Sequence, residues 1–310
     1  MEKPKVIIIG GPTASGKTGL SIELAKRING EIISADSMQI YKTLDVGTAK
    51  VTEEEKQGIK HYMIDVCNVE DKFSVADFQE LAYKYIEEIL AKGKTPIIAG
   101  GTGLYISSLV DNMKFTEEKE GEKEVRNKLY KKAEELGDNA VDYFYNELLK
   151  IDPEAAQKIE KNNLKRVIRA LEIYYTTGET KTAQDKKTTL EDIKYDYKTF
   201  ILDWDRELLY SRIGKRIDIM LQQDILKEVK WLKEKNLPKD NTAVAAIGYK
   251  EFFPYLDNEA TLEECVEKLK QETRRYAKRQ ITWFKRIRDK KYISYELSTE
   301  EKIKFILNNI

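Results

Sequence analysis

The apolar residues of this chain follow two different periods. Continuous apolar runs predict buried β-strands at residues 5–9, 31–35 and 95–99, and alternation of apolar and polar residues predicts a further strand at 195–202. Between these runs, apolar residues recur every three or four positions, which predicts amphipathic helices such as 18–29. Strands that alternate with helices are typical of an α/β domain with a parallel sheet flanked by helices.

The period changes in the middle of the chain. From about residue 114 to 194 the sequence is charged, poor in strand-like runs and helical in period. Asp152-Pro153 has the pattern of a helix N-cap followed by proline at the first helical position. We therefore expect an inserted all-helical lobe at 114–194, between a first core segment at 1–113 and a second at 195–310 that includes basic C-terminal helices.

The last long predicted helix carries a cluster of positive charge. It begins with the capping box Thr261–Glu264, and its mainly apolar seam runs to Ile287. Three aromatic residues, Tyr276, Trp283 and Phe284, are interleaved with nine cations, Arg274, Arg275, Lys278, Arg279, Lys285, Arg286, Arg288, Lys290 and Lys291. This pattern is typical of a surface that follows a nucleic-acid backbone and stacks on its bases. The alternative is a solvated cationic face over a seam packed in the core.

The composition gives no global charge bias. The 310 residues contain 54 Lys and Arg and 54 Asp and Glu, so any nucleic-acid binding must come from local clusters. Two cysteines outside any CxxC pair indicate a reducing compartment, and the cytoplasm is the expected location. No apolar run is long enough for a signal peptide or a membrane span, so we expect no membrane partner.

The clearest chemical motif follows the first predicted strand. A glycine-bounded loop leads into the helix at 18–29 and consists of Gly11, Pro12, Thr13, Ala14, Ser15, Gly16, Lys17 and Thr18. Such a loop points backbone N–H groups and the positive end of the helix dipole at one place, where phosphates bind. Lys17 can reach the outer phosphate oxygens, and the Thr18 hydroxyl can hold Mg²⁺. The motif predicts diphosphate binding and does not specify which diphosphate.

Polar residues also follow two other predicted strands. Asp36 and Ser37 come directly after the strand at 31–35, and ligands in such sheets lie beyond the carboxyl ends of the strands, so Asp36 should lie near the phosphate loop. From the residues alone, a turn or N-cap role for Asp36 is equally open. Thr102, in a glycine-rich turn after the strand at 95–99, is expected to cap a helix, contact a ligand, or do both.

The segment around the single histidine leaves alternatives open. His61 precedes a short apolar segment at 62–66, and an exposed position at a strand edge is expected for it, while a histidine-based triad is excluded. Asp65 either directs a carboxylate to a metal or only solvates a strand end.

Cations on two other predicted helices also have two interpretations each. Arg212 and Arg216 lie four residues apart on one helix face and could clamp a diphosphate, or they could simply solubilise the helix. In the lobe, basic residues opposite an apolar face form either a small binding patch or a solvated surface: Lys165, Arg166 and Arg169.

Six motifs, in order along the chain, resemble one family. They are Gly-Pro-Thr-Ala-Ser-Gly-Lys-Thr at 11–18, Ser-Ala-Asp-Ser with Gln-Ile-Tyr within 34–41, Gly-Thr-Ala-Lys at 47–50, Ala-Gly-Gly-Thr-Gly-Leu-Tyr at 99–105, Ile-Gly-Tyr-Lys at 247–250 and Ala-Lys-Arg-Gln-Ile-Thr-Trp-Phe at 277–284. Together they resemble the bacterial tRNA dimethylallyltransferases over essentially the whole chain. Two residues depart from the family's usual pattern: Val51 stands where proline is usual, and Asp224 where many members have glycine. Both departures concern loop geometry rather than chemistry.

The resemblance implies a P-loop NTPase-like fold and a reaction assisted by Mg²⁺. A dimethylallyl group would pass from dimethylallyl diphosphate to N6 of the adenosine beside the anticodon, on its 3′ side. By this resemblance Asp36 is the general base, Lys17 and the loop hold the diphosphate, and Thr18 carries Mg²⁺. Arg212 or Arg216 would supply further charge.

The resemblance also implies a set of contacts with the anticodon stem-loop of tRNA, made by a protein expected to be a monomer. The residues assigned to these contacts are Asp36, Ser37, Met38, Gln39, Thr102, Arg126, Lys165, Arg166, Arg169, Gly248, Tyr249, Lys250, Lys278, Arg279, Gln280 and Trp283.

Three rival classes share parts of this pattern. A P-loop small-molecule kinase or nucleotide hydrolase would use the same loop, but it leaves the cations of the last helix unexplained. An adenosine-phosphate isopentenyltransferase of the cytokinin-forming type would use the same chemistry on a free nucleotide, and the helical lobe and the basic helix favour tRNA over that acceptor. A non-enzymatic RNA-binding module would leave the phosphate loop without a role.

Overall fold

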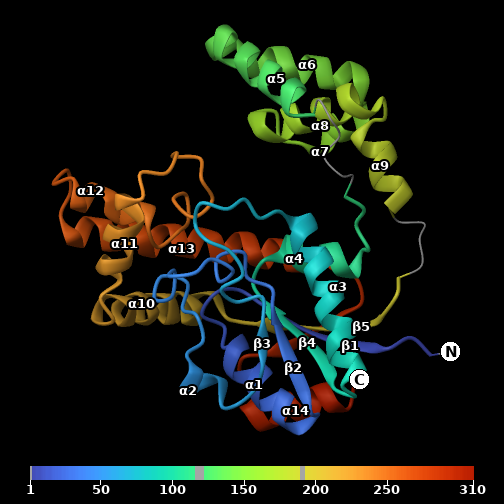
Figure 1. The fold of residues 1–310 in the computed structure, drawn as a ribbon, viewed down its shortest axis with the longest axis vertical. Coiled ribbons are helices and arrows are strands. Elements are labelled where there is room, and N and C mark those ends of the chain that lie inside the picture. The colour runs from blue at the N-terminus through green and yellow to red at the C-terminus, as the bar shows by residue number, and fades with distance from the viewer. Residues whose placement is uncertain (1, 116–121, 189–192) are drawn as a thin grey trace. The chain divides into compact units, whose positions relative to one another are not determined.

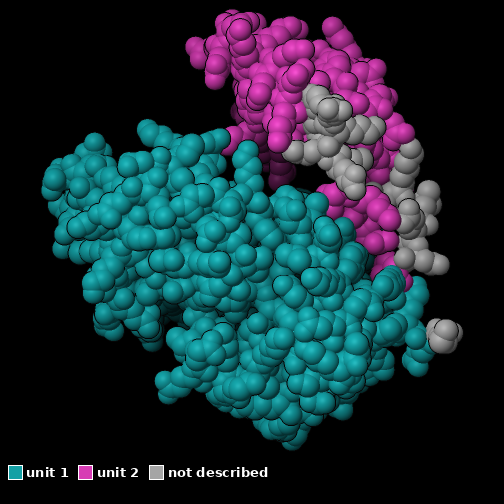
Figure 2. Space-filling model, in the orientation of Figure 1, with its two compact units in different colours: residues 1–110, 194–310 teal, residues 111–193 magenta. Residues whose placement is uncertain are grey.

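The computed structural model of the chain describes residues 2–115, 122–188 and 193–310. The chain divides into two compact units, which Figure 2 shows in different colours. The larger unit comprises Met1–Val110 and Lys194–Ile310, and the smaller unit comprises Asp111–Ile193, against the expected lobe at 114–194. Each unit has its own cluster of buried apolar side chains.

The larger unit is built around a parallel sheet (Figure 1). The strands that the described residues form are, in spatial order, β3 (His61–Tyr62), β2 (Gly30–Ser34), β4 (Thr95–Gly100), β1 (Lys5–Gly10), β5 (Asp196–Asp203) and β6 (Lys290–Ser294). β1 lies inside the sheet because its residues are apolar on both faces: Val6 and Ile8 pack on one side, and Ile7 and Ile9 on the other. The predicted α/β fold with a parallel sheet is confirmed.

Helices cover both faces of the sheet. α3 (Val75–Ala91) and α4 (Gly103–Val110) share a core with one face. α1 (Lys17–Arg27) and α14 (Thr299–Leu307) share a core with the other. Ser74 and Ser298 begin α3 and α14 through capping boxes, each with an acidic residue three positions later.

A third group of helices packs around its own core beyond the sheet. It consists of α10 (Arg206–Gln222), α11 (Ile225–Glu234), α12 (Phe253–Leu256) and α13 (Leu262–Phe284), with a 3₁₀ turn at Lys250–Phe252. Asp205 caps the start of α10, and the predicted capping box at Thr261 begins α13. The segment between β2 and β3 also joins this core through Ile40, Tyr41 and Leu44, before the short helix α2 (Glu53–Lys56). This core therefore fixes the loops around the carboxyl ends of the strands.

Two predicted elements differ from the structure. The seam of the last long helix was expected to run to Ile287, but α13 ends at Phe284, and Lys290 and Lys291 lie on the parallel strand β6. A cationic strand at the edge of a sheet buries few side chains, here Ile293, so it lacks a clear apolar pattern. The apolar segment at 62–66, which could have formed a strand, contributes only Tyr62 to β3, because Met63 and Asp65 have positive φ angles of 62° and 56°.

The two departures from the family pattern occupy defined positions. Val51 is buried and packs with the core under α1. Asp224 adopts a left-handed conformation with φ 61° just before α11, and its carboxylate pairs with Lys227 at 2.7 Å. Glycine adopts this conformation without steric strain, so a glycine at this position would fit the same turn.

The smaller unit is helical throughout its described residues. It contains α5 (Glu122–Leu136), a 3₁₀ turn at Gly137–Asn139, α6 (Ala140–Ile151), α7 (Pro153–Lys158), α8 (Leu164–Thr177) and α9 (Lys181–Thr188). Phe144, Leu148 and Leu171 are fully buried in its core. Asp152 caps α7 as predicted, and it also accepts a hydrogen bond from the Thr182 N–H at 2.9 Å. In neither unit is a described helix long and apolar enough to cross a membrane.

Candidate active site

The phosphate loop connects β1 to α1 in a strained conformation. Gly16 has φ 88° at the N-cap of α1, and Ala14 has φ 62°, both in the left-handed region. Within the described chain no side chain caps α1, so the N–H groups of its first turn are available to an anion. A Cβ on Gly11 would come within 3.0 Å of Ser15 Oγ. The glycines of the motif therefore shape a turn that other residues would disturb.

Lys17 lies inside this loop. Its Nζ donates a hydrogen bond to the carbonyl of Pro12 at 2.7 Å. Burial lowers the pKa of the Lys17 ammonium to about 8; the negative charge of Asp36 opposes this decrease, and the positive charge of Arg216 adds to it. A bound anion would favour the charged form of this ammonium.

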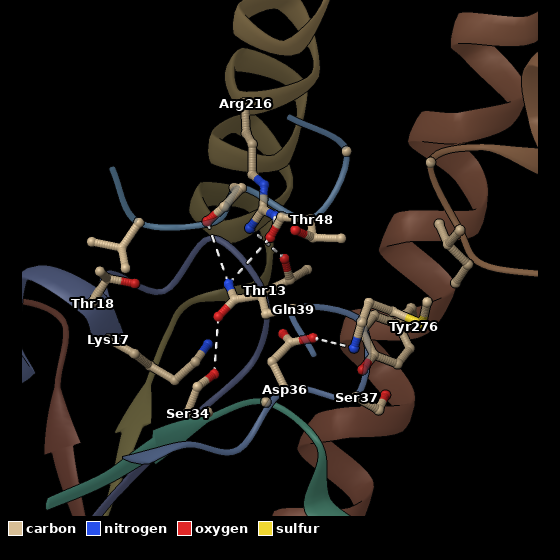
Figure 3. Close-up of a pocket in the computed structure, with 18 of the residues that line it drawn as sticks. Thr13, Lys17, Thr18, Ser34, Asp36, Ser37, Gln39, Thr48, Arg216 and Tyr276 are labelled. Carbon is tan, nitrogen blue, oxygen red and sulfur yellow. Dashed lines mark hydrogen bonds between the residues drawn. The ribbon is translucent and has the colours of Figure 1, made fainter. Parts of the chain in front are cut away.

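A cavity of about 260 Å³ extends from the loop. Figure 3 shows polar side chains from several elements around it. Its polar lining includes Thr13, Lys17, Thr18, Asp36, Ser37, Gln39, Thr48, Arg216, Tyr276 and Gln280, and its apolar lining includes Met38, Ile213, Ile217, Met220, Ile247 and Leu269. Gly248 also lines it. The structure therefore brings together the predicted loop residues, the segment from Asp36 to Gln39, and Arg216.

Asp36 lies at the carboxyl end of β2, as the order of strands predicts. Its Oδ1 accepts a hydrogen bond from the Met38 N–H at 2.9 Å, and its carboxylate faces the cavity (Figure 3). The expected turn role and the expected place near the phosphate loop therefore both hold for Asp36. Thr102 supports the same turn, because its Oγ1 accepts a hydrogen bond from the Ser37 N–H at 2.9 Å.

A close contact between backbones fixes the position of this turn. A Cβ on Gly100 would come 2.2 Å from the carbonyl oxygen of Ala35. The Thr102 N–H also donates a hydrogen bond to that carbonyl, at 3.0 Å. Only glycine at position 100 lets the end of β4 approach the residue before Asp36 so closely.

Gln280 joins the phosphate loop to the glycine-rich turn after β4. Its Oε1 accepts a hydrogen bond from the Thr13 N–H at 2.8 Å, and its Nε2 donates one to the Gly101 carbonyl at 2.9 Å. The side chain is 5% exposed. Gln280 was assigned to tRNA contact, but these bonds make it an internal brace of the loop.

The two arginines of α10 contact neighbouring residues of the phosphate loop, Ala14 and Thr13. Arg216 lines the cavity, and its guanidinium donates hydrogen bonds to Thr13 Oγ1 at 2.9 Å and to the Thr48 carbonyl at 3.1 Å. Arg212 is exposed, donates a hydrogen bond to the Ala14 carbonyl at 2.7 Å, and stacks 4.6 Å from the centroid of Trp204. Of the two, Arg216 is placed to contact a ligand in the cavity, whereas Arg212 supports the loop from outside.

Three aromatic residues differ from their expected roles: Trp283 and Phe284 were expected to stack on bases, and Tyr249 was assigned to tRNA contact. Phe284 and Tyr249 are fully buried, and Tyr249 donates a hydrogen bond from its hydroxyl to Glu228 at 2.9 Å, so neither ring can stack on a base. Trp283 is half-buried against α4, with its indole N–H donating to Ser107 Oγ at 3.0 Å. Phe284 and Tyr249 each belong to a hydrophobic core of the larger unit.

Tyr276 is a cavity residue that the sequence did not mark as one. It points toward the cavity beside Asp36 and Ser37 (Figure 3). Burial, with a contribution from the charge of Asp36, raises the pKa of its hydroxyl to about 12. Tyr276 is therefore a hydrogen-bond donor at neutral pH. Its position on the same α13 face as Thr273 and Gln280, at helical spacing, was the available signal.

The contacts of Asp65 and His61 indicate which of their alternative roles the structure supports. The carboxylate of Asp65 pairs with Lys50 at 2.7 Å, which supports the plain interpretation over a metal-directed one. His61 is half-buried and lines the cavity, so the expected exposed position is wrong; its Nδ1 lies 2.9 Å from the Ile59 carbonyl, and burial lowers the pKa of the ring. Among the described residues, no three His, Cys, Asp or Glu side chains form a cluster that could hold a metal.

The predicted tRNA-contacting cations lie on several surfaces. Lys278 and Arg279 of α13 are exposed, as are Lys250 and, in the smaller unit, Lys165 and Arg166. Arg126 and Arg169 both pair with the buried carboxylate of Glu172. These arginines are therefore held in place by a carboxylate that the sequence pattern did not identify.

Comparisons with known proteins agree with this geometry. A family model described as IPP transferase matches residues 39–287. A protein of Acetivibrio thermocellus named tRNA dimethylallyltransferase is 52% identical over 96% of this chain and 94% of its own. The crystal structure of a tRNA delta(2)-isopentenylpyrophosphate transferase from Staphylococcus epidermidis superimposes with a TM-score of 0.71 at 45% identity, covering 99% of this chain and 98% of that one. A structure of a eukaryotic dimethylallyltransferase acting on tRNA gives a TM-score of 0.81 at 32% identity, covering 99% of this chain and 80% of that one.

Proposed function

We propose that this chain, which belongs to the IPP transferase family, transfers a dimethylallyl group from dimethylallyl diphosphate to an adenosine of tRNA. One observation carries the proposal. The phosphate loop, the carboxylate of Asp36 and a set of apolar side chains line the same cavity. A diphosphate, a proton acceptor and an apolar wall are what an allylic diphosphate and a nucleophilic amine require.

The chemistry follows from the charges of the reactants. Adenine N6 is a weak nucleophile, so the reaction needs a base for its proton and stabilisation of the leaving group. The bond between C1 and the diphosphate oxygen breaks, the bond between N6 and C1 forms, and the N6 proton passes to the carboxylate of Asp36. Lys17, Arg216 and the loop N–H groups hold the departing diphosphate.

Mg²⁺ is the proposed cofactor. The residues present fit this ion, because Mg²⁺ keeps several waters and is held by few protein oxygens together with phosphate oxygens. Thr18 lines the cavity at the start of α1 and would supply its hydroxyl. When bound, Mg²⁺ would neutralise charge on the departing diphosphate.

The acceptor is proposed to be the adenosine 3′ to the anticodon, presented by the anticodon stem-loop. That base must leave its stack, at a cost of a few kcal/mol, before N6 reaches the cavity. The exposed cations Lys278 and Arg279 of α13, and Lys165 and Arg166 of the smaller unit, are proposed phosphate contacts. We further propose that the protein acts as a monomer in the cytoplasm.

Mass spectrometry of nucleosides tests this proposal. Unmodified tRNA is incubated with the protein, Mg²⁺ and dimethylallyl diphosphate, then digested. The expected product is a single adenosine enlarged by one dimethylallyl group, and the Lys17→Ala variant should yield none. Prenylation of adenosine monophosphate but not of tRNA would instead identify the cytokinin-forming type. Nucleotide hydrolysis without any prenylated product would identify a P-loop kinase or hydrolase.

A further inference from the structure

The turn that contains Gly47 and Thr48 forms the wall of the cavity that faces the phosphate loop. One side chain of α11, Glu228, holds this turn in place through hydrogen bonds. Glu228 Oε1 accepts hydrogen bonds from the N–H groups of Asp45 at 3.1 Å and Val46 at 2.7 Å, and its Oε2 accepts one from Gly47 at 3.2 Å. Three successive N–H groups that converge on one carboxylate form an anion-binding arrangement of the backbone. Here an internal carboxylate fills it.

Tyr249 completes the arrangement around Glu228. Its hydroxyl donates a hydrogen bond to Glu228 Oε2 at 2.9 Å, and burial, with the charge of Glu228, raises the pKa of this hydroxyl so that it remains a donor. The ring packs so tightly against the turn that a Cβ on Gly47 would come 2.4 Å from Tyr249 Cζ. The hydrogen bonds to Glu228 and the close packing of Tyr249 therefore hold the turn against α11.

The far side of the same turn contacts Arg216. The Thr48 carbonyl accepts a hydrogen bond from Arg216 Nη2 at 3.1 Å, while Arg216 Nη1 donates to Thr13 Oγ1 in the phosphate loop at 2.9 Å (Figure 3). The planar guanidinium has a fixed fork of donors, so these two acceptors determine its orientation in the cavity. A chain of contacts thus runs from Glu228 through the turn to Arg216.

We propose that Glu228 is a positioning residue for transfer: by fixing the 45–48 turn, it orients Arg216 toward the diphosphate. Glu228 itself does not line the cavity. The inference rests on the proposed function, because it assigns Arg216 to the departing diphosphate. Neither the phosphate-loop motif nor the spacing of α10 indicates a role for a carboxylate on α11.

The test combines conservative variants in a double-mutant cycle. Glu228→Gln keeps the shape of the side chain but turns an amide NH₂ toward at least one N–H donor of the turn. With tRNA saturating and dimethylallyl diphosphate varied, kcat/KM should fall about tenfold or more, while the Kd for tRNA changes less than twofold. In the Arg216→Ala background the same substitution should lower kcat/KM less than twofold, because the group through which it acts is gone.

Two further variants keep the result interpretable. Glu234→Gln makes the same chemical change on the same helix at an exposed position, and it should leave kcat/KM unchanged. Tyr249→Phe removes only one donor to Glu228 and should lower kcat/KM about threefold, again without effect in the Arg216→Ala background. If Glu228→Gln does not fold, the double-mutant cycle of Tyr249→Phe and Arg216→Ala tests the positioning role by itself.

The outcomes separate this inference from the proposed function. Absence of prenyl transfer by the wild-type protein overturns the proposed function. An active wild-type protein in which the Glu228 and Arg216 effects simply multiply, or in which Glu228→Gln matches Glu234→Gln, overturns the positioning role. An effect confined to thermal stability also overturns it.

Discussion

The side-chain oxygen of Gln280 accepts a hydrogen bond from the backbone N–H of Thr13, 267 positions away in the sequence. The helix that carries the exposed cations therefore also supports the phosphate loop from inside. A ligand on one surface of α13 and a ligand in the loop consequently share a structural element.

Replacement of Gln280 should affect the diphosphate more than tRNA. Gln280→Ala leaves the Thr13 N–H and the Gly101 carbonyl without their partner, at about 1–3 kcal/mol for such a buried group. We expect a higher KM for dimethylallyl diphosphate and a lower melting temperature, with an unchanged Kd for tRNA. Gln271→Ala, at an exposed position of the same helix, is the control. A selective loss of tRNA affinity would restore Gln280 as a tRNA contact.

Diphosphate binding should depend on pH through Lys17. The pKa of its ammonium is lowered to about 8 in the free protein, and a bound anion raises it, so binding takes up a proton above that pH. Relative to the Lys17→Met variant, in which only the ionisation of the ligand itself remains, affinity for inorganic diphosphate in metal-free buffer should fall by up to tenfold per pH unit above about 8. Calorimetry in buffers of different ionisation enthalpy measures the uptake. Lys17→Met should bind weakly and lack the proton uptake that Lys17 contributes.

Asp36→Asn should separate binding from chemistry. Asparagine keeps the oxygen that accepts from the Met38 N–H but cannot take up the N6 proton. We expect kcat to fall roughly 10²–10⁴-fold, the range for loss of a general base, with Kd values for both substrates nearly unchanged. Single-turnover kinetics gives the comparison. Near-normal kcat with a raised KM for tRNA would make Asp36 a binding residue and place the base elsewhere.

The cations of α13 should differ in their contribution to tRNA binding. Lys278→Ala and Arg279→Ala should each reduce the log–log slope of affinity against salt by about 0.7–0.9 if each removes one phosphate contact. Arg275 pairs with Glu272 at 2.6 Å, so Arg275→Ala should change the slope less. Fluorescence titration at several salt concentrations provides the slopes. If all three variants keep the salt-dependence slope of the wild type, these cations form a solvated face that does not contact phosphates.

Two glycine-to-alanine substitutions should have opposite effects on stability. A methyl group on Gly100 meets the Ala35 carbonyl at 2.2 Å, so Gly100→Ala should lower the free energy of unfolding by about 1–3 kcal/mol and also reduce turnover by displacing Asp36. Gly214 lies within α10 with open space around it, so Gly214→Ala should raise the free energy of unfolding by about 0.5–1 kcal/mol. Urea titrations compare both with the wild type.

Local patterns predicted much of this fold. The capping box at Thr261 and the buried runs of β1, β2 and β4 depend on residues close in sequence, so the sequence alone places them. β6 was missed because an edge strand needs little apolar pattern. Its recognition requires knowledge of its neighbour β5, which lies far away in the sequence.

The sequence predicted those site residues that come soon after the end of a strand, such as Lys17 after β1 and Asp36 after β2. It did not predict contacts that a side chain from a distant segment supplies. Gln280 reaches Thr13, and Glu228 reaches the turn at Val46, only because the third group of helices packs beside the strand ends. The same packing buries Tyr249 and Phe284, whose sequence neighbourhoods suggested an exposed surface.

Because β1 lies between β4 and β5 and precedes both in the sequence, it cannot complete its pairing early during synthesis. About 190 residues separate β1 from β5, which corresponds to roughly 10–40 seconds of synthesis at ordinary bacterial rates. During that interval one edge of β1 exposes an apolar run without a partner strand, the kind of surface that chaperones cover and that aggregates when crowded. Translation speed from β1 to β5, an interval that includes the helical unit at Asp111–Ile193, thus sets how long the nascent phosphate loop waits for its neighbour.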